Sequence, residues 1–201
     1  MKLNKDIITN IEFLLLEFIF NRKEISGYSI DQEIKKKKIR EWMNIGTTSI
    51  YLSLKKLKQK KFIKSKINHN KKGKGGLPII YKITEKGKRF LEKELIKVLS
   101  GAYESDVRFD IALLESSLVP STIKILSLKK RKQILIQKKS ELESMLSAID
   151  MQNFESQLLI NHKIDKIGSE INFVDKLIEI INGIEKKIKR EKRITTSLIA
   201  K

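Results

Sequence analysis

Hydrophobic residues in the first sixty positions follow the three- and four-residue spacing of amphipathic helices. The first such run covers residues 6–21, and a Ser-Gly pair breaks the pattern before a second, shorter run over residues 28–39. Gly46 breaks it again, and the hydroxyl of Thr47 or Thr48 is expected to cap a third helix by accepting a backbone N–H. The pattern therefore predicts three helices in close succession.

The third predicted helix separates an apolar side from a polar one. Ile50, Leu54 and Leu57 share one face. The opposite face presents a mainly polar and basic set, namely Thr48, Leu52, Lys55, Lys56 and Gln59. A helix of this kind suits contact with a groove of DNA. Trp42, just before it, is expected to pack in the core.

After Lys61 the spacing changes to the alternation that is typical of strands. Residues 62–67 and 79–83 both alternate, and a glycine- and lysine-rich segment separates them, which predicts a β-hairpin with a long basic tip. Thr84 and Glu85 then open a fourth helix that ends near residue 101. Three helices, a hairpin and a helix are the elements of a winged helix-turn-helix.

Beyond residue 101 the pattern predicts a connecting segment up to Pro120, for which a helix is one option, and then two long helices. The last helix alternates apolar steps of four and three, the spacing of a coiled-coil seam, through Ile160, Ile164, Ile167, Ile171, Val174, Ile178 and Ile181. The helix before it has a less strict seam that includes Leu128, Leu135 and Leu142. A small winged helix alone cannot hide both seams, so these residues are predicted to form a homodimer interface.

The predicted fold is mainly helical with a small β-hairpin wing. Residues 1–100 are expected to form a winged helix-turn-helix DNA-binding domain. Residues 101–201 are expected to form an antiparallel, coiled-coil-like helical dimerisation domain, which is also a candidate for sensing an effector. Arg108, Phe109 and Asp110 are candidates to line a pocket between the two domains.

Positive charge is concentrated in the first half of the chain. The net charge is +19, and residues 1–100 carry 25 Lys and Arg against 10 Asp and Glu, whereas residues 101–201 carry 18 against 14. Between Glu41 and Glu85 there is no acidic residue, and the window holds Lys55, Lys56, Lys58, Lys60, Lys61, Lys64, Lys66, Lys71, Lys72, Lys74 and Lys82. Biased codon usage explains abundant lysine but not its placement, so this window is predicted to bind a polyanion.

Double-stranded DNA is the polyanion that best fits these elements. Lysines would neutralise phosphates and supply affinity, whereas side chains at the exposed start of the third helix would reach base edges and supply selectivity. The candidate DNA-binding residues are Tyr28, Thr47, Thr48, Ser49, Tyr51, Leu52, Lys55, Lys56, Lys71, Lys72 and Lys74. A competing interpretation makes Thr48 and Ser49 helix caps and places Tyr51 in the core.

Other chemistries have little support in the sequence. The segment 69–76 lacks the GxxxxGK[ST] spacing of a nucleotide-binding loop, and no helix is predicted directly after it. There is no cysteine, and His69 and His162 lie far apart, so no enzyme, metal or cofactor is predicted. Apolar runs fall short of the roughly 18 residues that span a bilayer, and the first residues lack the layout of a secretory signal. A cytoplasmic, nucleoid-associated protein without membrane contact is expected.

Three stretches carry a family likeness: GYSI at residues 27–30, GTTSIYLSLKKL at residues 46–57 and GLPIIYKITEKG at residues 76–87. In order and spacing they resemble the PadR family of transcriptional regulators. In that family a GY pair opens the second helix, a G-[ST]-[IL]-Y-x-x-L-x-x-L run forms the recognition helix, and a G-x-P wing leads into Y-x-[IL]-T-x-x-G. The resemblance covers roughly residues 7–100, and the longer helical region resembles the subgroup with an extended C-terminal dimerisation domain.

The resemblance implies a homodimer that represses promoters by binding palindromic operators. It also implies release from DNA when a small molecule or another signal alters the dimer geometry. Two alternatives stay open at this point. One is an architectural protein that binds all nucleic-acid duplexes nearly alike, and the other is an interaction protein whose C-terminal helices capture another protein without binding DNA.

Overall fold

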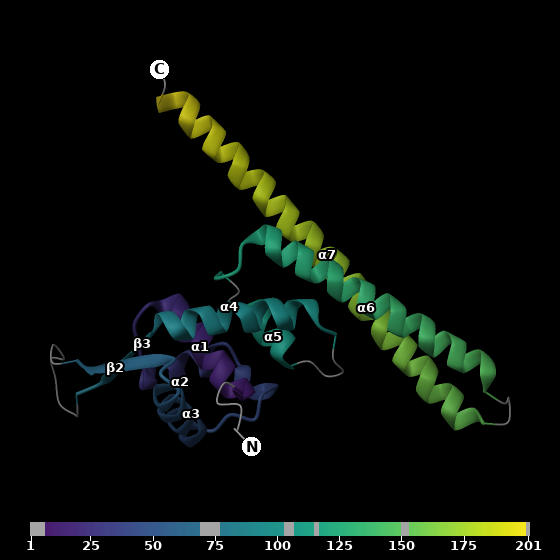
Figure 1. The fold of residues 1–201 in the computed structure, drawn as a ribbon, viewed down its shortest axis with the longest axis horizontal. Coiled ribbons are helices and arrows are strands. Elements are labelled where there is room, and N and C mark those ends of the chain that lie inside the picture. The colour runs from purple at the N-terminus through teal and green to yellow at the C-terminus, as the bar shows by residue number, and fades with distance from the viewer. Residues whose placement is uncertain (1–6, 69–76, 103–106, 115–116, 150–152, 200–201) are drawn as a thin grey trace. The chain divides into compact units, whose positions relative to one another are not determined.

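The computed structural model describes residues 7–68, 77–102, 107–114, 117–149 and 153–199, and it separates into two compact units (Figure 1). The first unit comprises residues 1–98 and 105–118, and the second comprises residues 99–104 and 119–201. This division differs from the predicted boundary at residue 100. The reason is that the short helix α5, Val107–Leu114, packs on α1 of the first unit.

The first unit is a winged helix-turn-helix, as predicted. Its elements are α1 (Asn10–Arg22), β1 (Ile25–Ser26), α2 (Gly27–Lys36), the 3-10 turn η1 (Ile39–Glu41), α3 (Thr47–Gln59), β2 (Ile63–Ile67), β3 (Ile79–Ile83), α4 (Glu85–Ser100) and α5. The first helix begins later than the predicted residue 6, because Thr9 and Glu12 form a reciprocal capping box. The second helix stops at Lys36, and Lys38 then adopts a left-handed backbone conformation with φ of 54°.

Helix α1 lies at the centre of this unit. Eight consecutive residues, Glu12 to Ile19, are buried, so the helix is covered on all sides rather than along one stripe. Its contacts reach α3, α5, β1 and β3. Helix α3 and strand β3 of the wing therefore both pack against one buried helix.

The wing is part of a three-stranded antiparallel sheet with the order β1-β3-β2. The two-residue strand β1 was not predicted, because two residues are too few to show alternation. Its Ser26 pairs with Ile80 of β3, while Lys66 of β2 pairs with the same residue from the other side. Because side chains alternate along a strand, these registers place Lys64, Lys66 and Lys82 on one face of the sheet.

Gly87, in the first turn of α4, permits a close approach to the backbone of Phe62, just before β2. A Cβ atom at this position would lie 2.1 Å from the carbonyl oxygen of Phe62. Thr84 fixes the same junction, because its backbone N–H and its hydroxyl both donate to that carbonyl, at 2.9 and 3.1 Å. Helix α4 can take its place beside the sheet because residue 87 has no side chain.

Substitution Gly87→Ala is expected to lower the free energy of unfolding of the first unit by about 2–4 kcal/mol, since backbone must move to admit the methyl group. Chemical denaturation followed by circular dichroism measures this change. The matched control is Gly168→Ala in the second unit, where a Cβ would meet no atom within 4 Å. The control should be neutral or stabilising by up to about 1 kcal/mol, and equal effects of both substitutions would contradict the close-packing argument.

The second unit is a helical hairpin of α6 (Ser121–Ala148) and α7 (Phe154–Ile199), which lie side by side and antiparallel (Figure 1). Arg131 of α6 is 2% exposed and donates to Glu170 of α7 at 2.8 Å and to the carbonyl oxygen of Gly101. Lys132 pairs with Asp175 of α7 at 2.6 Å. These buried and half-buried ion pairs set the register of the two helices.

The predicted interface residues lie on the seam of this hairpin. Within one chain, Leu128, Leu135, Ile160 and Val174 are already buried. The other six are partly exposed: Leu142, Ile164, Ile167, Ile171, Ile178 and Ile181. A short connection folds the two striped helices onto each other, so part of both seams is already buried within one chain.

Helix α7 is much longer than its partner. It has 46 residues against 28 in α6, which corresponds to about 69 Å against about 42 Å. Since the helices start together at their connection, the C-terminal part of α7 extends past the beginning of α6 (Figure 1). An apolar stripe of Phe173, Ile180, Ile184 and Ile188 along α7 is 45–59% exposed.

Candidate nucleic-acid interface

Helix α3 presents the face that the sequence predicted for DNA contact. Ile50, Leu54 and Leu57 are fully buried beneath it. On the outer side Thr47, Thr48, Tyr51, Leu52, Lys55 and Lys56 are exposed, and Ser49 is half-buried. Neutral side chains therefore occupy the first two turns and lysines follow them, an arrangement in which one part can approach bases and the next can approach phosphates.

The start of α3 is fixed by a polar cluster rather than by a helix cap. The prediction that Thr47 or Thr48 caps the helix is wrong, because the N-cap is Gly46 and makes no side-chain hydrogen bond. The Thr47 hydroxyl instead donates to Asp31 of α2 at 3.3 Å and accepts from Arg40 at 3.0 Å. Asp31 is 6% exposed and also pairs with Arg40 and with Lys35. One buried carboxylate thus joins α2, the turn and α3.

Tyr51 connects the recognition helix to the start of α2. A Cβ on Gly27 would lie 2.7 Å from its ring atom Cε1, so the ring packs against the glycine backbone. Tyr51 is nevertheless 47% exposed. The two interpretations of this residue, core packing and DNA contact, are therefore compatible, because one edge of the ring packs and the rest faces solvent. Tyr28, the residue after this glycine, is 67% exposed.

Burial raises the pKa of Tyr81 on β3, and nearby Tyr51 adds to the rise.

The lysine face of the wing, defined by Lys64, Lys66 and Lys82, surrounds one carboxylate. Glu24 pairs with Lys66 at 2.9 Å and with Lys82 at 3.8 Å. The hydrogen bond from Lys66 lowers the pKa of Glu24, and the charges of Lys82 and Lys64 act in the same direction. Glu24 therefore stays ionised at neutral pH and offsets part of the positive charge of the wing.

In the folded chain, the positive charge of the window between Glu41 and Glu85 is therefore less uniform than the sequence suggests. Carboxylates from outside the window engage three of its lysines: Glu12 takes Lys60, and Glu24 takes Lys66 and Lys82. Lys55, Lys56, Lys58, Lys61 and Lys64 are exposed. The predicted wing-tip residues Lys71, Lys72 and Lys74 lie outside the described residues. The exposed lysines of this window therefore lie on α3, in the turn after it and on β2.

Two other predicted placements change. Trp42 does not pack in the core, because it is 41% exposed, whereas the neighbouring side chains of Met43 and Ile45 are buried in its place. Arg108 is committed within the first unit, to Ile8, Asn10 and Glu94. Sequence reasoning did not identify Asp31 or Arg108 as supports of the site, since their partners lie 16 and about 100 positions away.

Residues 15–93 match the profile of the family described as the transcriptional regulator PadR-like family. This segment contains α2, α3 and the wing, including the three motif stretches. Over this segment the chain is PadR-like. The matched profile is that of a family of transcriptional regulators. A comparison with curated protein sequences gives no match.

Solved structures of PadR-like proteins are similar to the chain. Bacillus subtilis PadR in complex with operator DNA shares 19% identity over 87% of this chain and 99% of that chain, with a TM-score of 0.42. The same protein in complex with p-coumaric acid shares 16% identity over 87% and 99%, with a TM-score of 0.36. A PadR family regulator from Clostridium difficile R20291 shares 26% identity over 55% and 100%, with a TM-score of 0.36.

Among the described residues of this PadR-like chain, none of the helices has both the length and the apolar character needed to cross a membrane. The described part also contains no cluster of three or more His, Cys, Asp or Glu side chains suited to a metal ion.

Substitution Asp31→Asn is expected to destabilise the first unit by about 1–2 kcal/mol, because Arg40 and Lys35 lose their shared, buried counter-charge. Urea denaturation of the purified chain measures the effect. Glu41→Gln serves as the control, since Glu41 is 68% exposed and pairs across one helical turn with Lys38. That pair should contribute less than about 0.5 kcal/mol. Equal losses for the two substitutions would show that Asp31 does not hold the start of α3.

Proposed function

We propose that the chain is a sequence-specific DNA-binding regulator that acts as a homodimeric repressor on a palindromic operator. The observation that carries the proposal is the outer face of α3. Its apolar side is fully buried, and its exposed side runs from Thr47, Thr48 and Leu52 to Lys55 and Lys56. Such a helix can enter the major groove with its N-terminal residues at the base edges.

The two parts of this face would make separate contributions. Threonine hydroxyls can donate to or accept from base edges, and Leu52 can contact a thymine methyl group. Lys55 and Lys56 would neutralise phosphates and release counterions, which adds affinity without sequence information. Glu24 moderates the nonspecific contribution of the wing, because it engages two lysines that would otherwise attract any duplex.

The decisive experiment is a selection of bound duplexes from a random DNA pool by the purified chain. The enriched sequence is then titrated against a scrambled duplex at one salt concentration. A palindrome bound at least about 10³-fold more tightly than the scrambled duplex is expected. Equal affinity for every duplex would contradict the repressor proposal and favour an architectural protein. Absence of any DNA binding would favour an interaction protein.

Lys55→Gln tests whether α3 supplies the phosphate contacts. It should weaken binding to specific and scrambled DNA alike and reduce the slope of log affinity against log salt by about one. Lys129→Gln removes the same charge from an exposed position on α6 and should leave both quantities unchanged. If the two variants behave alike, net charge rather than α3 governs the binding.

A second copy of the chain is the proposed partner of α7. The stripe of Phe173, Ile180, Ile184 and Ile188 is exposed, and part of it extends beyond α6. A stripe of large apolar side chains at helical spacing is the kind of surface that homodimer interfaces bury. A two-fold dimer would also match the symmetry of a palindrome.

We infer further that the regulator works in the cytoplasm, at the nucleoid, and that an effector can release it from DNA. Bacillus subtilis PadR itself binds a small molecule, p-coumaric acid.

Sedimentation of the full chain should give a dimer at micromolar concentration. Ile180→Glu places a carboxylate in the stripe and should shift the chain to monomer by at least about tenfold in dissociation constant. Asn182→Glu introduces the same group on the opposite side of α7, at another exposed position, and should leave the dimer intact. A monomeric wild-type chain, or equal effects of both substitutions, would refute this interface.

A further inference from the structure

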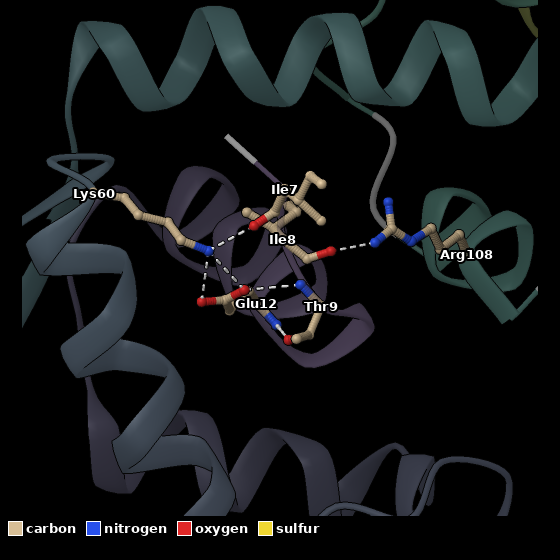
Figure 2. A network of polar contacts seen from close by, with 6 residues as sticks. All are labelled: Ile7, Ile8, Thr9, Glu12, Lys60 and Arg108. Atoms are coloured by element: carbon tan, nitrogen blue, oxygen red, sulfur yellow. Dashed lines mark hydrogen bonds and ion pairs between the residues drawn. The ribbon is translucent and has the colours of Figure 1, made fainter. Parts of the chain in front are cut away.

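Two consecutive backbone carbonyls at the beginning of the described chain are held by cations from different elements (Figure 2). The ammonium group of Lys60 donates to the carbonyl oxygen of Ile7 at 2.8 Å. The guanidinium group of Arg108 donates to the carbonyl oxygen of Ile8. Lys60 follows α3 directly, and Arg108 belongs to α5. The segment 7–9 therefore links the end of the recognition helix to α5.

The Lys60 side of this link is a buried ion pair. Its ammonium lies 3.1 Å from both carboxylate oxygens of Glu12, which is 1% exposed. The same carboxylate accepts the backbone N–H of Thr9 at 2.8 Å, and the Thr9 hydroxyl accepts the N–H of Glu12 at 3.2 Å (Figure 2). Since Lys60 is also the C-cap of α3, the last turn of the recognition helix is anchored to the first turn of α1. In a buried site such a pair is costly to disturb.

The Arg108 side holds the same segment from the opposite direction. Besides the Ile8 carbonyl, its Nε donates to Asn10 at 2.9 Å and its Nη1 pairs with Glu94 of α4 at 3.2 Å. The guanidinium also lies 5.9 Å from the ring centroid of Phe13. A planar group with several donors can satisfy these acceptors together, which a lysine ammonium cannot do with the same geometry. Arg108 thus fixes the path of residues 7–10 into α1.

We propose that Arg108 is a positioning residue for DNA recognition. It holds residues 7–9 so that the Ile7 carbonyl and Glu12 together receive Lys60 and set the end of α3. This inference rests on the proposed function and goes beyond it, because Arg108 and residues 7–9 lie outside the segment 15–93 that matches the family. Helix α5 is then a working part of the DNA-binding unit.

The link itself is tested without DNA, by amide hydrogen exchange of the full chain. Arg108→Gln should speed exchange of peptides covering residues 54–62 by at least about threefold, while peptides from α6 stay unchanged. Arg89→Gln removes the same group from an exposed position on α4 and is the matched control. Unchanged exchange at residues 54–62 in Arg108→Gln would overturn the inference. Where that variant fails to fold, Asn10→Ala removes one acceptor of Arg108 and should act in the same direction.

The consequence for DNA is measured with the selected duplex. Arg108→Gln should bind it about tenfold more weakly with an unchanged salt slope, since Arg108 itself neutralises no phosphate. Arg108→Lys should restore part of the affinity. A reduced slope would show direct phosphate contact and refute the positioning role, as would wild-type affinity. If the wild-type chain selects no duplex, the proposed function fails, and the role in DNA recognition fails with it. Selection by the wild type with unaltered exchange in Arg108→Gln refutes this inference alone.

Discussion

The orientation of α3 on the buried helix α1 is the constraint on which the rest of the DNA-binding unit depends. Burial of Ile50, Leu54 and Leu57 sets which face of α3 points outward. Apolar burial is non-directional, however, and does not fix the position of α3 along its contact with α1. Buried charge supplies the missing direction. Asp31 holds the first turn of α3, and the Glu12–Lys60 pair holds the last. Both ends of the helix are anchored before any DNA is present, so less ordering is left for the binding step.

The same carboxylates also shape the electrostatic surface. A stretch of more than forty residues with no acid reads as a uniform basic strip, yet Glu12 and Glu24 reach into it from earlier in the chain. Lys60 pairs with buried Glu12 and so stabilises the fold, whereas Glu24 partly neutralises Lys66 and Lys82. The exposed charge that remains clusters around α3. The pairs with Glu24 lower the positive charge that the wing presents, and nonspecific affinity for DNA grows with each phosphate that a protein neutralises.

In the second unit, the heptad-like pattern forms a contact within one chain. Heptad-like spacing marks both α6 and α7 as helices that need apolar partners. The hairpin satisfies Leu128, Leu135 and Val174 within one chain. The stripe containing Ile180 and Ile184 is left exposed, on a helix that outruns its neighbour. Spacing alone cannot distinguish an intrachain seam from an interchain one, because both bury the same residue types at the same period.

Local spacing was enough to predict the four helices of the winged helix-turn-helix, its hairpin and the two long C-terminal helices. It also predicted the inner and outer faces of α3 and the likeness to PadR regulators, because these follow from periodicity and short motifs. It could not reveal strand β1, whose two residues gain their role from pairing with β3. It also missed the cap of α3, where Thr47 is drawn to Asp31, and the exposure of Trp42. Arg108 and Lys60 are the clearest cases: their partners lie about 100 and 50 positions away. Such pairings arise when the chain folds and brings the two elements together, so they belong to the tertiary structure.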